Sequence, residues 1–106
     1  MKIVFKKEYL AELYNTGKTT NKKYRFQPEV IAGYLKCVKA IQTVVRIEDL
    51  YVINSLHYEK LRGDKQGLSS VRVNKQYRLE FREVTNPNNI TEVEFCSLIE
   101  LSNHYK

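Results

Sequence analysis

The apolar residues of this chain follow two different periods, and this change of period constrains the fold more than any other feature of the sequence. In the first half they recur every three to four residues, which is the spacing of one face of an α-helix. From Gly67 onward they alternate with polar residues, which is the spacing of one face of a β-strand. A helical first half followed by an extended second half predicts an α+β domain.

Two helices are expected in the first half. Apolar residues between Phe5 and Tyr14 predict a short amphipathic helix. It should end near Gly17, because glycine adopts the left-handed conformation that closes a helix. Pro28 suits the first turn of a longer helix. One apolar face of that helix then continues for about four turns, through Val30, Ile31, Tyr34, Leu35, Val38, Ile41 and Val45.

Strands are expected at both ends of the chain. Residues 2–5 form a short first strand, and a hairpin follows Gly67, with a turn at residues 74–76 and a second turn at residues 86–89 that leads to a last strand. With 106 residues the chain has the length of one domain. We therefore expect a single α+β domain over residues 1–106, with two N-terminal helices packed on one face of a mostly antiparallel sheet.

The opposite face of the hairpin is expected to be positively charged. Strand alternation places Arg72, Arg78 and Arg82 there together with Ser70 and Glu80. The loop before the hairpin adds Lys60, Arg62 and Lys65. Guanidinium groups offer a planar fork to phosphate oxygens, so this surface suits a phosphate-bearing ligand. A solvated strand face with scattered charge would show the same pattern.

The overall charge also indicates an anionic partner. The formal net charge is +6, and the basic residues, Lys22 and Lys23 among them, concentrate in residues 1–80. No apolar run approaches the roughly 18 residues of a membrane span, so we expect a cytoplasmic protein that does not enter a membrane. Cys37 and Cys96 lack metal-ligand or Cys-x-x-Cys spacing, and we interpret both as buried, reduced packing residues. Neither a metal nor another cofactor is expected.

The segment from residue 57 to 82 resembles a known family. Its strings Y-E-K-L-R-G-D-K-Q-G (58–67), S-V-R-V-N (70–74) and Y-R-L-E-F (77–81) are similar to the "L-K-G-D-R-x-G", "S-I-R-V-N" and "W-R-I-x-F" motifs of HigB-type toxins. These toxins belong to the RelE/ParE superfamily of bacterial toxin–antitoxin systems. The resemblance implies a metal-independent endoribonuclease that cuts mRNA on the ribosome and so inhibits translation. It also implies a cognate HigA-like antitoxin with a helix-turn-helix. Operator DNA would be bound by this antitoxin and not by the toxin itself.

The resemblance further implies roles for single residues. Arg78 matches the arginine of "W-R-I", which stabilises the phosphate, and the family's carboxyl-terminal "D-Y-H" is similar to Asn103-His104-Tyr105. Proton transfer then falls to His104 with Glu59 or His57, and Tyr105 would orient or stack on a base. The residues expected to contact RNA are Lys22, Lys23, Lys60, Arg62, Lys65, Arg72 and Arg82.

Two other functions are compatible with the same residues. One is a ParE-like inhibitor of DNA gyrase, which acts by protein contact and needs no acid–base residues. The other is a non-enzymatic module that binds nucleic acid. The carboxyl end separates the nuclease from the ParE-like inhibitor, because a nuclease should depend on His104 and Tyr105, whereas a ParE-like protein should tolerate their replacement.

Overall fold

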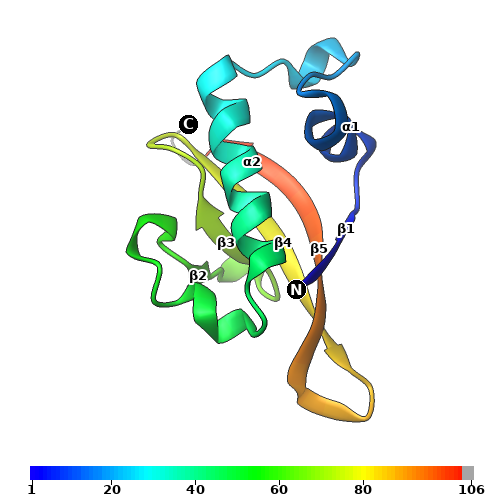
Figure 1. Ribbon diagram of the computed structural model, residues 1–106, viewed down its shortest axis with the longest axis vertical. Helices are drawn as coiled ribbons and strands as arrows, with labels where there is room; N and C mark the ends of the chain where they lie inside the picture. Colours follow the sequence, from blue (N-terminus) through cyan, green and yellow to red (C-terminus); the bar gives the residue numbers. More distant parts are fainter. Residues whose placement is uncertain (104–106) are drawn as a thin grey trace.

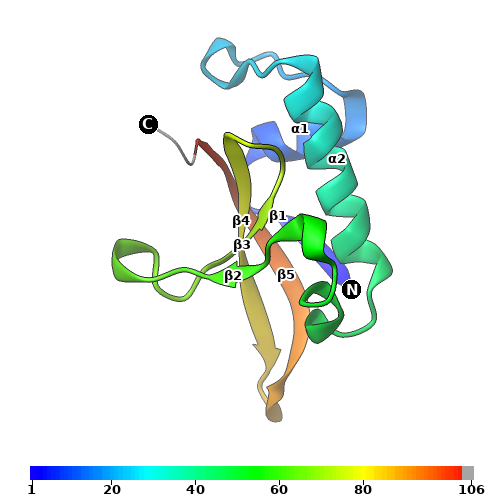
Figure 2. The ribbon, with the colours of Figure 1, turned by 90° about the vertical axis from the view of Figure 1, so that its left-hand side faces the viewer.

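The computed structural model describes residues 1–103, in which two α-helices cover one face of a five-stranded sheet (Figures 1 and 2). The α+β fold predicted from the change of period is confirmed. In chain order, with η for a 3-10 helix, the elements are β1 (Lys2–Phe5), α1 (Glu8–Thr16), η1 (Lys22–Tyr24), α2 (Pro28–Thr43), η2 (Ile47–Leu50), η3 (Asn54–Leu56), β2 (Glu59–Lys60), η4 (Gly63–Lys65), β3 (Ser69–Arg72), β4 (Tyr77–Asn86) and β5 (Asn89–Asn103).

The strands follow the order β1-β5-β4-β3-β2 across the sheet. β2 to β5 form an antiparallel meander, while β1 runs parallel to β5, with Lys2 beside Phe95. The expected hairpin, last strand and first strand are thus confirmed. The two-residue β2 was not predicted, because so short a strand has no period to detect. β4 and β5 shift register between Glu80 and Phe81, which marks a β-bulge.

The helices begin and end close to the positions that the sequence predicts. α1 stops at Gly17, which is left-handed (φ 77°) and whose N–H bonds to the Leu13 carbonyl oxygen at 2.9 Å. α2 starts at Pro28 but ends at Thr43, because Val44 is extended. Val45, which we expected on its apolar face, therefore lies beyond the helix and is 83% exposed. No helix within residues 1–103 is both long and apolar enough to cross a bilayer.

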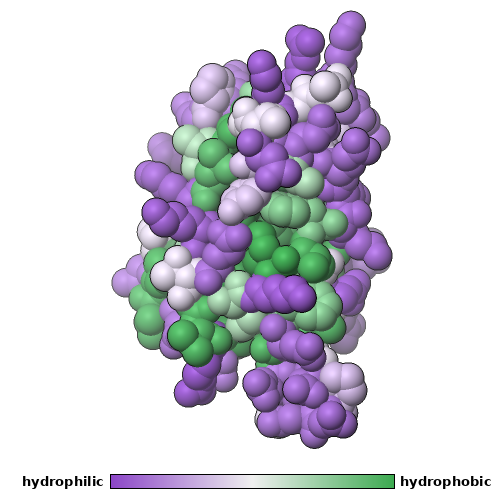
Figure 3. Space-filling view, turned by 45° about the vertical axis from the view of Figure 1, so that its right-hand side comes forward, coloured by the Kyte–Doolittle hydropathy of each residue, from purple (hydrophilic) through white to green (hydrophobic). Residues whose placement is uncertain are grey.

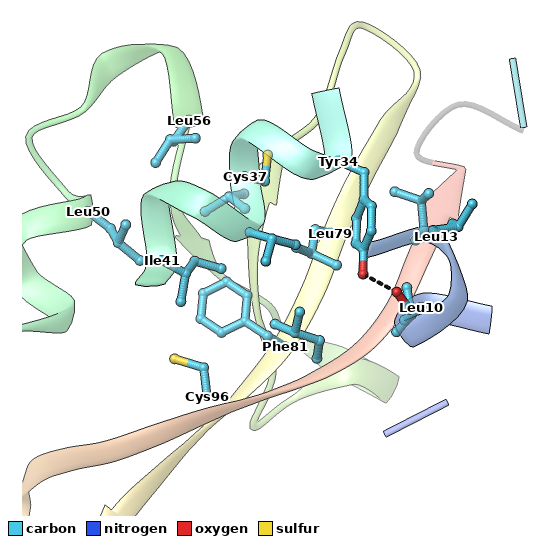
Figure 4. Close-up of a cluster of buried hydrophobic side chains, with 14 of the residues drawn as sticks. Leu10, Leu13, Tyr34, Cys37, Ile41, Leu50, Leu56, Leu79, Phe81 and Cys96 are labelled. Carbon is cyan, nitrogen blue, oxygen red and sulfur yellow. Dashed lines mark hydrogen bonds between the residues drawn. The ribbon is translucent and has the colours of Figure 1, made fainter. Parts of the chain in front are cut away.

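The core lies between α1, α2 and the sheet (Figure 4). Ile41 of α2 and Leu79 and Phe81 of β4 are fully buried in it. Tyr34 is also fully buried, and its hydroxyl donates to the Leu10 carbonyl oxygen at 2.7 Å, which ties α2 to α1. Both cysteines lie in this core as free thiols, as predicted.

The sheet face away from the helices is less open than the sequence predicts. Ser70 and Glu80, expected beside the arginines on a solvated face, are 0% and 5% exposed. The Arg78 side chain lies over Ser70, and Lys65 reaches Glu80 from the β2–β3 loop. In Figure 2 this loop stands out from the sheet on the side away from the helices. The loop and long cationic side chains cover these positions, and strand alternation does not predict such cover.

The outer edge of the sheet is formed by β1. Figure 3, which brings this side forward, shows apolar side chains gathered in its middle and hydrophilic ones around them. Val4 of β1 and Tyr14 of α1 remain 38% and 39% exposed. This apolar side of the molecule is separate from the arginine-bearing face.

Candidate active site

Two arginines face each other across the β3–β4 hairpin. Arg72 and Arg78 are register partners, and residues directly opposite each other in an antiparallel pair have Cβ atoms about 5 Å apart. Like charges at this spacing destabilise a hairpin when nothing compensates them. The arrangement therefore favours an anionic ligand between or above the two groups, and we call these two residues the arginine pair.

The guanidinium group of Arg78 is fixed across β3. Its Nε donates to Ser70 Oγ at 2.8 Å, and its Nη2 donates to the His57 carbonyl oxygen at 2.5 Å and to the Ser70 carbonyl oxygen at 3.5 Å. Ser70 is fully buried beneath it, while Arg78 itself is half-buried. These bonds set the plane of the fork in advance of any ligand.

His57 joins the two arginines. It closes η3 in the left-handed conformation (φ 45°), and no other non-glycine residue in the described range has a positive φ. Backbone of this kind is uncommon and concentrates at functional sites. Its Nε2 lies 3.3 Å from Nη1 of Arg72. Because arginine only donates, a hydrogen bond at this contact uses the Nε2 lone pair as its acceptor.

Two carboxylates on the neighbouring strands β4 and β5 are each matched by a lysine. Glu80 Oε2 accepts from Lys65 Nζ at 2.6 Å. Its register partner on β5, Glu100, accepts from Lys7 Nζ at 2.7 Å. These lysines neutralise the carboxylates locally, so the arginine pair keeps its positive charge for a ligand. Lys65, which we predicted to contact RNA, thus has a partner within the protein.

The remaining predicted cations of the hairpin region lie on β2, on the β2–β3 loop or against that loop. Arg82 is exposed and follows the bulge, and its Nη1 lies near Gly67, where an added Cβ would come within 3.2 Å. Lys60 and Arg62 are exposed and line a groove of about 880 Å³, together with Glu59. The groove runs between the β2–β3 loop and the outer half of β4. Glu59 in its lining is the register partner of Ser70, over which the Arg78 side chain lies.

Two of the last predicted residues lie on a different element. Lys22 and Lys23 lie in η1, which packs on α1 through the stacked rings of Tyr24 and Tyr9 (3.8 Å between centroids). Figures 1 and 2 place η1 at the far end of α2 from β2. His104 and Tyr105 lie outside the described residues. β5 is described up to Asn103, and the residue before it, Ser102, is the register partner of Arg78.

Sequence reasoning missed the groups that support His57. The next residue, Tyr58, donates its hydroxyl to Glu83 Oε2, which also accepts from Ser69 Oγ at 2.6 Å. Burial is the main cause that raises the pKa of Tyr58 well above its ordinary value, and the hydrogen bond to Glu83 raises this pKa further. One signal existed, since Glu83 continues the apolar face of Leu79 and Phe81 in the alternation of β4. An acid at such a position requires buried hydrogen-bond donors.

The arrangement suits the binding and stabilisation of a phosphate. Guanidinium groups stay protonated and act through charge and hydrogen bonds, whereas the His57 lone pair is able to accept a proton. Burial raises the pKa of Cys37 to about 12, with the Arg78 charge opposing it, so this thiol is not a nucleophile at neutral pH. Within residues 1–103 no three His, Cys, Asp or Glu side chains form a group that could hold a metal ion.

Known proteins are similar to this chain in sequence. The model of the HigB-like toxin family, described as RelE-like toxins of type II toxin–antitoxin systems, matches residues 3–94. The chain belongs to this family. Toxin HigB-1 of Vibrio cholerae serotype O1 is 32% identical over 85 residues, which span 79% of this chain and 85% of that toxin. The resemblance seen in the motifs is therefore confirmed.

Solved structures show the same fold at low sequence identity. A YoeB/ParE toxin from Agrobacterium tumefaciens is 15% identical with a TM-score of 0.56, over 99% of this chain and 100% of that one. The YoeB–YefM complex from Staphylococcus aureus includes a chain that is 17% identical with a TM-score of 0.51, over 99% of this chain and 98% of that one. As a HigB-like toxin, this protein belongs to a class of ribosome-dependent endoribonucleases that need no metal, and cleavage of mRNA to inhibit translation is typical of it.

Proposed function

We propose that the arginine pair and His57 form the phosphate-binding centre at which this HigB-like toxin cleaves mRNA on the ribosome. The observation that carries the proposal is the contact of both guanidinium groups with one residue, at 3.3 Å to His57 Nε2 and 2.5 Å to its carbonyl oxygen. Two guanidinium groups held in this way are placed to bind the oxygens of a single phosphodiester. Donors fixed before the reaction stabilise the charge that builds up on a phosphorane.

The proposed reaction is an internal transfer within the RNA. The ribose 2′-oxygen attacks the adjacent phosphorus while a base removes its proton. The bond to the 5′-oxygen then breaks as an acid protonates that leaving group, which yields a 2′,3′-cyclic phosphate and a 5′-hydroxyl. Candidate bases are His57 and Glu59. The His57 lone pair becomes available once a phosphate takes over the donors of Arg72. We assign the acid to His104 and base stacking to Tyr105.

The exposed cations around the centre are proposed to hold the RNA backbone. Lys60 and Arg62 line the groove beside β2, and Arg82 lies next to the same loop. Contacts of this kind release counterions, so binding should weaken steeply as salt concentration rises. Lys22 and Lys23 are exposed on η1 and would contact ribosomal RNA at a separate place.

Partners beyond the RNA follow from the type II system to which the toxin belongs. We propose that its antitoxin is a HigA-like protein with a helix-turn-helix, which binds the operator while it holds the toxin. A net charge of +6 suits an antitoxin that is acidic where it touches the toxin. We propose that the toxin is cytoplasmic, because its proposed action is on ribosomes.

A reconstituted translation reaction tests the proposal. Message 5′ ends are mapped with and without ribosomes, for the parent protein and for Arg72→Ala and Arg78→Ala. Arg46→Ala is the matched control, because the Arg46 side chain is 71% exposed and its salt bridge to Glu48 lies on the surface. We expect cleavage only with ribosomes, a loss of more than about hundredfold in both pair variants, and no change in the control.

Other outcomes would assign a different function. Full cleavage by both pair variants would place the centre elsewhere. RNA binding without any cleavage would indicate a non-enzymatic module. Inhibition of DNA gyrase in a supercoiling assay, unaffected by His104→Ala and Tyr105→Ala, would indicate a ParE-like mode of action.

A further inference from the structure

We propose that Gly33 and Cys37 of α2 are positioning residues for Arg72, which they hold through the backbone at the end of β3. The inference rests on the proposed function, because it assigns these two residues a role in cleavage. They lie four positions apart on α2 and so on one side of the helix. Each of them contacts a different backbone group of the Arg72-Val73 segment.

Gly33 brings the helix backbone against the strand. A Cβ at this position would lie 2.5 Å from the Val73 carbonyl oxygen and 2.9 Å from Val73 Cγ1. Real Cβ atoms do not approach backbone this closely, so an alanine would force the strand and the helix apart. Glycine is destabilising in the interior of a helix. The close approach of the α2 backbone to Val73 explains why glycine is present at position 33.

Cys37 fixes the residue before Val73. Its Sγ donates to the Arg72 carbonyl oxygen at 3.2 Å. Within residues 1–103, β2 pairs only with Ser69 and Ser70, so β3 has no neighbouring strand beyond them on that side. The thiol thus satisfies a carbonyl group at an otherwise unpaired edge. Because Cys37 is 2% exposed and burial raises its pKa to about 12, the sulfur keeps its proton and remains a donor.

The two contacts act on the arginine pair through the backbone. The Arg72 side chain spans from its fixed Cα to the His57 ring, and its Nε donates to the Asn74 carbonyl oxygen at 3.3 Å. A shift at the end of β3 would move these contacts and the spacing to Arg78. Displacing a catalytic group by about 1 Å costs on the order of hundredfold in rate. α2 itself is anchored in the core by the buried Tyr34 and Ile41.

Single-turnover cleavage on saturating ribosomes tests this role, with ribosome affinity and melting temperature measured on the same proteins. We expect Cys37→Ala to lower the cleavage rate about threefold, as loss of a weak hydrogen bond would, without changing ribosome affinity. Cys37→Ser keeps a donor and should retain the rate. Gly33→Ala should lose at least about tenfold. Cys96→Ala is the matched control, since Cys96 is equally buried and its thiol makes no hydrogen bond among the described residues.

A merely structural role gives a different result. Cys37→Ala and Cys96→Ala would then behave alike, and Cys37→Ser would be no better than Cys37→Ala, because a buried hydroxyl is costlier than a methyl group. Either result would overturn the proposal. This comparison of cysteine variants does not depend on whether Gly33→Ala folds.

A double-mutant cycle separates this inference from the proposed function. In the Arg72→Lys background, which keeps a charge, Cys37→Ala should add little further loss, because both changes act on one guanidinium position. Fully additive losses, with cleavage still dependent on Arg72, would refute the positioning role alone. Cleavage that is indifferent to Arg72→Lys and Arg72→Ala would refute both.

Discussion

Replacing Lys65 by methionine removes the cation that matches a buried carboxylate beside the arginine pair. The Lys65 and Glu80 side chains are 47% and 7% exposed, and their charged atoms are 2.6 Å apart. Methionine keeps much of the aliphatic stem that covers the sheet, so the change isolates the charge. Glu80 would then be left in a buried position without its counter-charge.

The magnitude follows from burial. Removing one partner of a fully buried pair costs about 3–5 kcal/mol. Because Lys65 is half-exposed, water screens part of the interaction, and we expect a loss of about 2 kcal/mol. The charged atoms of the Lys7–Glu100 pair have a similar separation, 2.7 Å, but both side chains are 39% exposed. Lys7→Met should therefore cost less than about 1 kcal/mol.

Urea unfolding followed by circular dichroism measures both losses. A difference of about 2 kcal/mol corresponds to a shift of about 10 °C in melting temperature for a domain of this size. Adding Glu80→Gln to Lys65→Met should recover part of the lost stability, since a neutral amide is less costly to bury. Equal losses in Lys65→Met and Lys7→Met, or no recovery by Glu80→Gln, would refute the reasoning from burial.

Four further predictions concern the core and the site. Tyr34→Phe removes the buried hydrogen bond to Leu10 and should cost about 1 kcal/mol in the same unfolding assay. Burial raises the pKa of Cys37 and Cys96 to about 12 from an ordinary 9.0, so neither should react with iodoacetamide in the native state at neutral pH. Their contribution to stability is complete below about pH 9 and should be lost as the pH rises towards about 12, which melting curves across this range would show. Arg78→Lys keeps the charge but loses the fork over Ser70, so single-turnover cleavage should fall at least about tenfold.

Local signals determined the elements of this fold. Helical spacing, Gly17 and Pro28 place the two helices, because each acts within a few residues of the chain. Alternation after Gly67 likewise predicts the hairpin that carries Arg72 and Arg78, and short motifs within it already indicate the HigB-like family. The helix boundary at Val45 was wrong by two positions because the apolar period continues past the point where the backbone becomes extended.

Contacts between distant segments were decided only by the tertiary structure. β1 pairs with the last strand, and Lys65 and Arg78 cover Glu80 and Ser70 on a face where alternation predicts solvent. His57 meets the arginine pair because a left-handed turn and the anchored Tyr58 bring a connector back to the sheet. Such contacts depend on how loops return through space, and no period or motif in the chain encodes that path. The residues for phosphate chemistry are thus visible in the sequence, but their common position is a property of the packed domain.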